Sequence, residues 1–190
     1  MAERAQPKMT VEQFFEWQQG QDRNYELVDG LPVLPLKSMT GATATHDTLT
    51  VNAIMALQTR LRGKPCRART TDISVRTFRG TRRPDVTVEC GRPDPKSMAA
   101  DDPRVVIEIL SPSTMRFDRF RKLEEYKAHE RIRVILLVDT EAPQLAVWRR
   151  GADGGWSVSE QAGLDATIAL PEIDAELPLA ELYEDVAFGE

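Results

Sequence analysis

The sequence predicts a single α/β domain in which helices flank a central mixed β-sheet, with β-hairpins added. The segment 134–138 is a nearly all-apolar β-type run, and such a strand is usually covered on both faces. A predicted helix at 117–130 precedes it and a predicted strand at 104–110 precedes that helix, so a strand-helix-strand unit is expected. The 190 residues suffice for one sizeable core, and they show no internal repeat and no dividing linker.

Composition sets the expected boundaries and cellular setting. Residues 1–9 are interpreted as a flexible N-terminus, 10–183 as the domain and 184–190 as an acidic C-terminal tail. No stretch approaches the roughly 18 apolar residues of a membrane span, so we expect a soluble protein without membrane contact. Cys66 and Cys90 belong to no C-x-x-C or Cys/His cluster, which gives zinc or redox roles little support and favours a reducing cytoplasm.

The N-terminal part predicts a short helix and a hairpin. Thr10 and Gln13 form a capping-box pattern at the start of an apolar run that Gly20 ends. Segments 25–28 and 31–34 then flank an Asp-Gly turn, which is among the strongest two-residue hairpin signals. Prolines in and after the second segment place it at the edge of a sheet.

A longer helix and a series of strands follow. The helix is predicted between residues 46 and 61 from one apolar stripe that recurs every four positions: Leu49, Ala53, Leu57 and Leu61. Strands are expected at 66–69, 72–78, 84–89 and 104–110, and a final hairpin at 144–149 and 156–160. The candidate chemistry falls in the last two strands before the helix, at 84–89 and 104–110.

Two carboxylates interrupt otherwise typical strand segments. Asp85 follows a proline at the start of one strand, and Glu108 lies inside the apolar run 105–110 of the next. If the strands are neighbours, the carboxylates lie side by side, as a hard cation such as Mg²⁺ requires. The alternatives are a solvent-facing strand end for Asp85 and a salt bridge to an arginine for Glu108, since an unpaired buried charge costs several kcal/mol.

Four motifs occur in an order that resembles the Uma family of putative restriction endonucleases, a branch of the PD-(D/E)XK nuclease superfamily. They are Tyr25-Glu26-Leu27-Val28-Asp29-Gly30, Arg83-Pro84-Asp85, Glu108-Ile109-Leu110-Ser111-Pro112-Ser113-Thr114, and the series Asp118, Lys122, Tyr126. The resemblance runs from about Thr10 to about Trp148. It implies a restriction-endonuclease-like domain and a Mg²⁺-dependent DNA endonuclease that hydrolyses phosphodiester bonds.

The resemblance also implies a set of catalytic residues. Asp85, Glu108 and the backbone carbonyl of Ile109 would hold Mg²⁺, with Mn²⁺ as a substitute and no small-molecule cofactor. The superfamily's usual pattern has lysine two residues after the glutamate, where this sequence has Leu110. In this family the lysine looks relocated to the following helix, as Lys122. The alternative for Lys122 is a solvated helix face with an i, i+4 ion pair to Asp118.

Several further residues are candidates for supporting roles. Glu26, His46 and Tyr126 are candidate neighbours of the metal or substrate, although Glu26 and His46 could equally be ordinary surface side chains. The segment 60–83 is strongly basic, and its Arg67, Arg69, Arg82 and Arg83 are candidate phosphate contacts, unless the segment is simply a solvated face.

The net charge of −5 does not favour tight nonspecific DNA binding, which depends on neutralising phosphates. A homodimer is expected, because two copies related by a twofold axis most simply cut both strands of a duplex. Two other functions remain open at this point. One is a nonenzymatic binding or regulatory module on a degenerate nuclease fold, and the other is a metal-dependent nuclease acting on RNA or another phosphoester.

Overall fold

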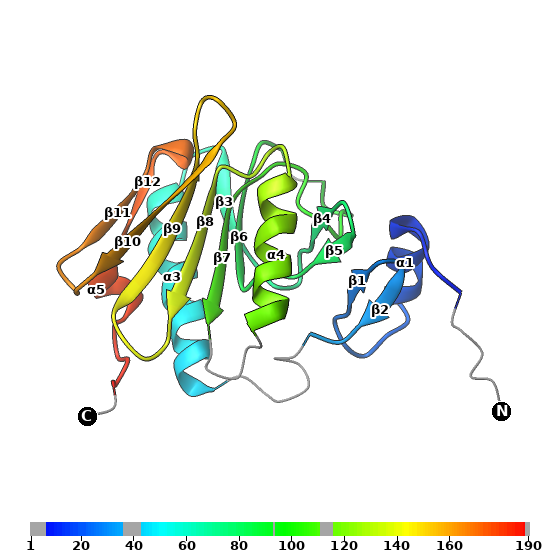
Figure 1. Cartoon of the computed structure of the whole chain (residues 1–190), viewed down its shortest axis with the longest axis horizontal. Coiled ribbons are helices and arrows are strands. Elements are labelled where there is room, and N and C mark those ends of the chain that lie inside the picture. Colours follow the sequence, from blue (N-terminus) through cyan, green and yellow to red (C-terminus); the bar gives the residue numbers. More distant parts are fainter. Residues whose placement is uncertain (1–6, 36–42, 93, 111–115, 189–190) are drawn as a thin grey trace.

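The computed structural model describes residues 7–35, 43–92, 94–110 and 116–188, with backbone only for 116–119. Its centre is a six-stranded sheet in the order β10-β9-β8-β7-β6-β3 (Figure 1). The strands are β3 (Cys66–Thr70), β6 (Val86–Cys90), β7 (Pro103–Leu110), β8 (Val134–Asp139), β9 (Gln144–Arg150) and β10 (Trp156–Ala162). Strands β7 and β8 are parallel and the other neighbours are antiparallel, which confirms the predicted mixed sheet.

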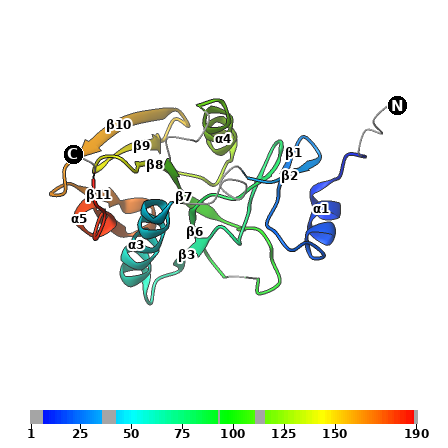
Figure 2. The ribbon, with the colours of Figure 1, turned by 90° about the horizontal axis from the view of Figure 1, so that it is seen from below.

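One helix covers each face of this sheet. Helix α3 (Ala44–Leu61) and helix α4 (Arg116–Ala128) lie on opposite sides of it, as the view from below shows (Figure 2). The predicted stripe on α3 is buried throughout and packs on Val86, Ile107 and Leu136. On the other face, Leu123 and Tyr126 of α4 pack with alternate residues of β7 and β8. Strand β8 is therefore buried on both faces, as its apolar sequence predicts.

A second, four-stranded sheet extends from the α4 side with helix α1 (Val11–Gln18) (Figure 1). Its order is β2-β1-β5-β4, formed by β1 (Glu26–Val28), β2 (Leu31–Val33), β4 (Val75–Thr77) and β5 (Gly80–Arg82). The predicted hairpin is β1–β2, and β2 lies at the sheet edge as expected. Gly80, with φ of 141°, is required in β5, because a Cβ there would lie 2.2 Å from the carbonyl oxygen of Leu27.

The strand predicted at 72–78 is shorter in the structure, where it is β4 at Val75–Thr77. The chain turns after β3, and the next strand begins only at Val75. The guanidinium of Arg83 donates hydrogen bonds to the carbonyls of Thr71 and Asp72 and so holds this turn in place. These contacts are long-range, so strand propensity alone does not reveal them.

The C-terminal segment adds structure that the sequence does not predict. Strands β11 (Thr167–Leu170) and β12 (Ala175–Pro178) form a hairpin around a short 3-10 helix η1 (Pro171–Ile173), and α5 (Leu179–Leu182) follows. Their apolar side chains join the core beneath α3. Val186 and Phe188 also pack against this core, so the segment expected to be an acidic tail is partly anchored.

The two cysteines correct the expectation drawn from their spacing. Cys66 in β3 and Cys90 in β6 lie directly opposite each other and form a disulfide. A stable disulfide is uncommon in a reducing cytoplasm, and the cytoplasmic location stays a prediction. In the part of the chain that the structure describes, no helix is long and apolar enough to cross a membrane.

Candidate active site

Asp85 directly precedes β6, and Glu108 lies near the end of β7. Val86 of β6 pairs with Ile107 of β7 in antiparallel register. Asp85, the residue before Val86, is therefore opposite Glu108, the residue after Ile107. The amide N–H of Ile109 donates a 2.8 Å hydrogen bond to Asp85 Oδ2. Asp85 is 3% exposed, so it is not a solvent-facing strand end.

The other oxygen of Asp85 faces helix α3. His46 Nε2 lies 3.2 Å from Asp85 Oδ1, and His46 is buried. The position of His46 is fixed by the start of α3, since Thr43 Oγ1 caps the helix by accepting a hydrogen bond from the His46 amide. The structure thus places His46 beside the candidate carboxylate and excludes a purely solvent-exposed position for it.

Glu108 faces helix α4. The hydroxyl of Tyr126 donates a 2.6 Å hydrogen bond to Glu108 Oε1, and Tyr126 is completely buried. Burial, reinforced by the negative charge of Glu108, raises the pKa of the Tyr126 hydroxyl well above its ordinary value. Tyr126 therefore stays protonated and acts as a donor that fixes the glutamate's orientation.

Lys122 lies one helical turn before Tyr126 and points inward. Its Nζ is 3.9 Å from Glu108 Oε1 and 2.9 Å from Glu26 Oε1. The residue is 9% exposed, which does not fit the alternative of a solvated helix face. The side chain of Asp118, its partner in that alternative, lies outside the described residues. Lys122 is therefore positioned between two carboxylates on different strands.

The carboxylate of Glu26 is bound by cationic side chains, Lys122 among them. Its Oε1 also accepts a 3.0 Å hydrogen bond from the amide of Arg83, and its Oε2 lies 3.1 Å from Arg82 Nη1. Burial alone would raise the pKa of Glu26, but the charges of Lys122 and Arg82 and the amide of Arg83 together hold it below its usual value. Glu26 is thus an ionised partner of Lys122, and its supporting role at the metal site stays a prediction.

Arg82 and Arg83 are buried, which contradicts their expected contacts with phosphate. Arg82, 2% exposed, makes two hydrogen bonds to Glu125 of α4, of 2.9 and 2.5 Å, besides its contact with Glu26. Burial would lower the pKa of Arg82, but Glu125 and Glu26 outweigh it and raise the pKa. Arg83 is 1% exposed, and its guanidinium donates to backbone carbonyls, including that of Tyr25 at 2.8 Å. Sequence reasoning missed Glu125, whose partner lies 43 residues away.

The rest of the basic segment is largely neutralised by acidic partners. Within it, the side chains that form ion pairs with carboxylates are Arg60, Lys64, Arg69, Arg76, Arg79 and Arg82. Arg67 donates hydrogen bonds to the backbone carbonyls of Pro65 and Gly91. Arg67 and Arg69 remain partly exposed, so their contact with phosphate stays a prediction. The segment is much less basic towards solvent than its composition indicates.

A cavity of about 550 Å³ opens beside Asp85. Its walls come from the segment before β1, the first turns of α3, and the turn after β3. The lining residues are Arg23, Asn24, Pro35, His46, Asp47, Thr50, Thr70, Thr71, Arg83 and Asp85. Asp85 and His46 thus link the carboxylate site to a space large enough for a small ligand. Apart from His46, Arg83 and Asp85, these residues were not predicted from the sequence, where isolated threonines and asparagines carry no distinctive pattern.

The donor atoms at the site suit a hard divalent cation. Mg²⁺ is usually held by one or two carboxylates and retains several waters. Asp85 and Glu108 supply two carboxylates, and a carboxylate oxygen that accepts one hydrogen bond keeps a lone pair for a cation. Among the described residues, no group of three or more His, Cys, Asp or Glu side chains forms a metal cluster. The residues therefore fit a cation held by two carboxylates and water, and the Ile109 carbonyl stays a predicted ligand.

Known proteins resemble this chain over most of its length. An uncharacterized Synechocystis protein, slr1290, is 26% identical over 185 residues, covering 96% of this chain and 95% of the relative. A second uncharacterized Synechocystis protein, sll1609, is 24% identical over 165 residues, covering 84% of this chain and 91% of that relative. The crystal structure of a putative nuclease belonging to DUF820 from Anabaena variabilis superposes with a TM-score of 0.72, covering 94% of this chain and 99% of that one at 15% identity.

The superposition shows that the fold is shared with a putative nuclease, in agreement with the predicted restriction-endonuclease-like domain. A family model described as Uma2, putative restriction endonuclease, matches residues 11–180. This match includes Asp85, the strand that carries Glu108 and the helix that carries Lys122. The chain therefore belongs to the Uma2 family of putative restriction endonucleases.

Proposed function

We propose that the protein is a Mg²⁺-dependent endonuclease that hydrolyses phosphodiester bonds of DNA. The observation that carries this proposal is the approach of Lys122 to Glu108, which lies on β7 one register step beyond the Val86–Ile107 pair, on the side where Asp85 precedes β6. Asp85 is tied to β7 through the Ile109 amide, and Lys122 Nζ lies 3.9 Å from Glu108. Membership of the Uma2 family supports the reaction class.

Each residue of the site has a distinct task in this proposal. The chemistry that Mg²⁺ would supply when bound here is charge neutralisation on the phosphoryl group and a more acidic water. Asp85 and Glu108 hold the cation, while Tyr126 and the Ile109 amide keep the carboxylates oriented. Lys122 orients the attacking water and offsets the negative charge that develops in the transition state.

The position of Lys122 also bears on the missing lysine at Leu110. The usual lysine position of the motif is occupied by Leu110 in this sequence. Because α4 packs against β7, Lys122 on the helix can supply an ammonium group beside Glu108 instead. Lys122 is, however, closer to Glu26, at 2.9 Å, than to Glu108. That contact supports the second candidate function, a nonenzymatic binding or regulatory module in which Lys122 is only a structural ion-pair partner.

Cleavage assays separate these two functions. Purified protein is incubated with plasmid DNA, single-stranded DNA and RNA in Mg²⁺, in Mn²⁺ and in EDTA. The proposal predicts metal-dependent cleavage of DNA, whereas binding without cleavage in every metal supports the module. If duplex DNA is the substrate, we expect the protein to act as a homodimer, because two copies can cut both strands. Sedimentation velocity measures the oligomeric state.

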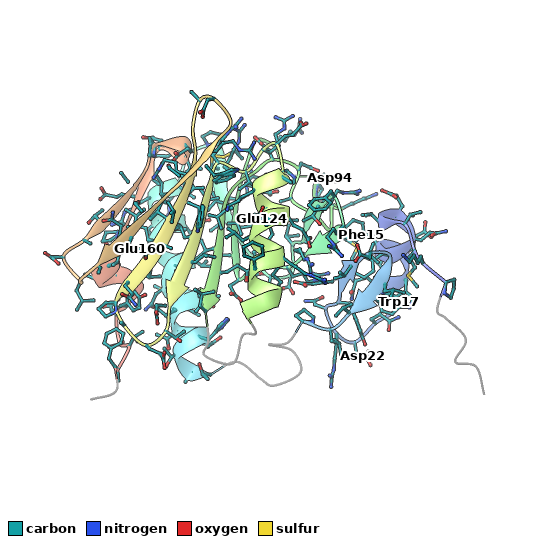
Figure 3. The ribbon with its side chains drawn as sticks, in the orientation of Figure 1. Phe15, Trp17, Asp22, Asp94, Glu124 and Glu160 are labelled. Atoms are coloured by element: carbon teal, nitrogen blue, oxygen red, sulfur yellow. A yellow bond between two sulfur atoms is a disulfide. The ribbon has the colours of Figure 1, made fainter. Side chains whose placement is uncertain are left out.

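Lys122→Ala is expected to lower the single-turnover rate by roughly 100-fold or more while changing DNA affinity only a few-fold. The reason is that the ammonium acts chiefly when negative charge accumulates in the transition state. The matched control is Lys127→Ala on the same helix, whose ammonium pairs with the exposed Glu124 (Figure 3) and lies over the ring of Trp148. Equal losses in the two variants would indicate general electrostatics and not a catalytic position.

A further inference from the structure

The cavity beside Asp85 carries chemistry that the hydrolytic site does not use. Besides its charged residues, its lining has the hydroxyl groups of Thr50, Thr70 and Thr71, the side-chain carbonyl of Asn24, whose amide nitrogen donates to Asp72, and the apolar Pro35. These uncharged donors and acceptors suit the edge of a nucleobase or a sugar better than a row of phosphates. At about 550 Å³ the cavity lies within the range of small-ligand sites, roughly 300–1,000 Å³.

The walls of the cavity are held in place by buried contacts. Arg83 joins the segment before β1 to the turn after β3, because its guanidinium donates to the carbonyls of Tyr25, Thr71 and Asp72. On the α3 side, the Thr50 hydroxyl donates to the carbonyl of His46, at 2.8 Å. The cavity is therefore built into the fold and is not a gap between surface side chains.

The charges around the site do not form a long track for a DNA duplex. Arg82 and Arg83 are buried, and most other basic residues of the segment 60–83 already pair with carboxylates. The lining of the cavity includes one exposed cation, Arg23, and one exposed carboxylate, Asp47. Duplex binding depends on neutralising several phosphates, so this surface favours local contacts with one nucleotide.

We infer that the cavity binds one unpaired nucleotide next to the scissile phosphate, and that the substrate is accordingly single-stranded or frayed DNA. A base inside an intact duplex would have to leave its stack to enter the cavity, which costs a few kcal/mol. An unpaired nucleotide presents its base edge to Asn24 and the threonines without that cost, while its phosphate lies towards Asp85. This inference rests on the proposed function, because it names the substrate of the same site.

Thr50→Met tests the inference by filling the cavity from helix α3 without altering the carboxylates. The matched control is Thr59→Met, the same substitution on the same helix at an exposed position outside the cavity. The probes are the four deoxynucleoside 5′-monophosphates, titrated one at a time by calorimetry with Ca²⁺ present. We expect wild type to bind at least one of them and Thr50→Met to weaken this binding at least about 10-fold, with Thr59→Met unchanged.

Cleavage of matched single-stranded and duplex oligonucleotides gives the second readout. Wild type is expected to prefer the single strand at least about 10-fold in kcat/KM, and Thr50→Met to lose that preference. Absence of mononucleotide binding to wild type, equal binding by Thr50→Met, or a preference for duplex would overturn the inference. Nucleotide binding is measured without turnover. If wild type binds a nucleotide, Thr50→Met weakens that binding and wild type cleaves no DNA, the results would contradict the proposed function alone. Metal-dependent cleavage with a cavity that binds nothing would contradict this inference alone.

Discussion

Asp85→Asn and Glu108→Gln are each expected to reduce Mg²⁺-dependent DNA cleavage by at least about 1,000-fold and to leave the fold intact. Each substitution removes an anionic oxygen ligand while nearly preserving side-chain volume. The uncharged amides can still accept hydrogen bonds from the Ile109 amide and the Tyr126 hydroxyl. The measurement is the single-turnover cleavage rate, with circular dichroism to compare the folded states.

A suitable control is Glu89→Gln, which neutralises a buried carboxylate near the other end of β6. Glu89 is 6% exposed and pairs with Arg69 at 2.7 Å. It lies in the same strand that Asp85 precedes, so it reports on the general loss of a buried negative charge. Wild-type cleavage by the Asp85 or Glu108 variant, or an equal loss in the Glu89 variant, would show that the metal site is assigned wrongly.

Arg82→Ala is expected to have the largest effect on stability, lowering the free energy of unfolding by roughly 3–5 kcal/mol. The variant leaves the buried carboxylates of Glu26 and Glu125 without their shared cation. Urea denaturation of both proteins measures the difference. The control is Arg76→Ala, which breaks an exposed pair with Glu12, whose two side chains are 51% and 71% exposed, and should cost at most about 1 kcal/mol.

The cost of Arg82→Ala should also depend on pH. The pKa of Glu26 is lowered in the folded protein, so its ion pairs stabilise the fold fully above its unfolded pKa of about 4.3. This contribution is lost as the pH falls through the folded pKa, because the protonated carboxyl no longer needs a cation. The difference in stability between wild type and variant should therefore shrink in acid. A small difference that does not change between neutral and acidic pH would mean that the buried network does not act as described.

Local patterns explain which parts of this fold are predictable. The apolar stripe on α3 and the all-apolar β8 encode their own burial through periodicity and composition, and both are buried as expected. Glu108 is recognisable because a carboxylate inside an apolar run requires a partner. The identity of that partner depends on how α4 docks, and the strand sequence cannot specify that. The convergence of Lys122 and Tyr126 on Glu108 is thus a property of the tertiary structure.

Charge and cysteine spacing mislead for the same reason. Arg82 and Arg83 belong to a basic segment whose composition predicts solvent exposure. The partners of Arg82 lie in β1 and α4, and Arg83 donates to a backbone turn distant in sequence. Cys66 and Cys90 are brought together by the register of β3 and β6, which no short motif encodes. Predictions from composition therefore fail where burial is decided by long-range pairing.

The central claim is that Asp85 and Glu108 together hold a divalent cation. The most direct test is the thermal unfolding of wild type and Glu108→Gln during titration with Mn²⁺, which requires no substrate. At about 100 times its dissociation constant, a cation that binds only the folded wild type should stabilise it by roughly 2.7 kcal/mol, and the variant should gain much less. A melting temperature that does not respond to Mn²⁺, or that rises equally in both proteins, would contradict the claim.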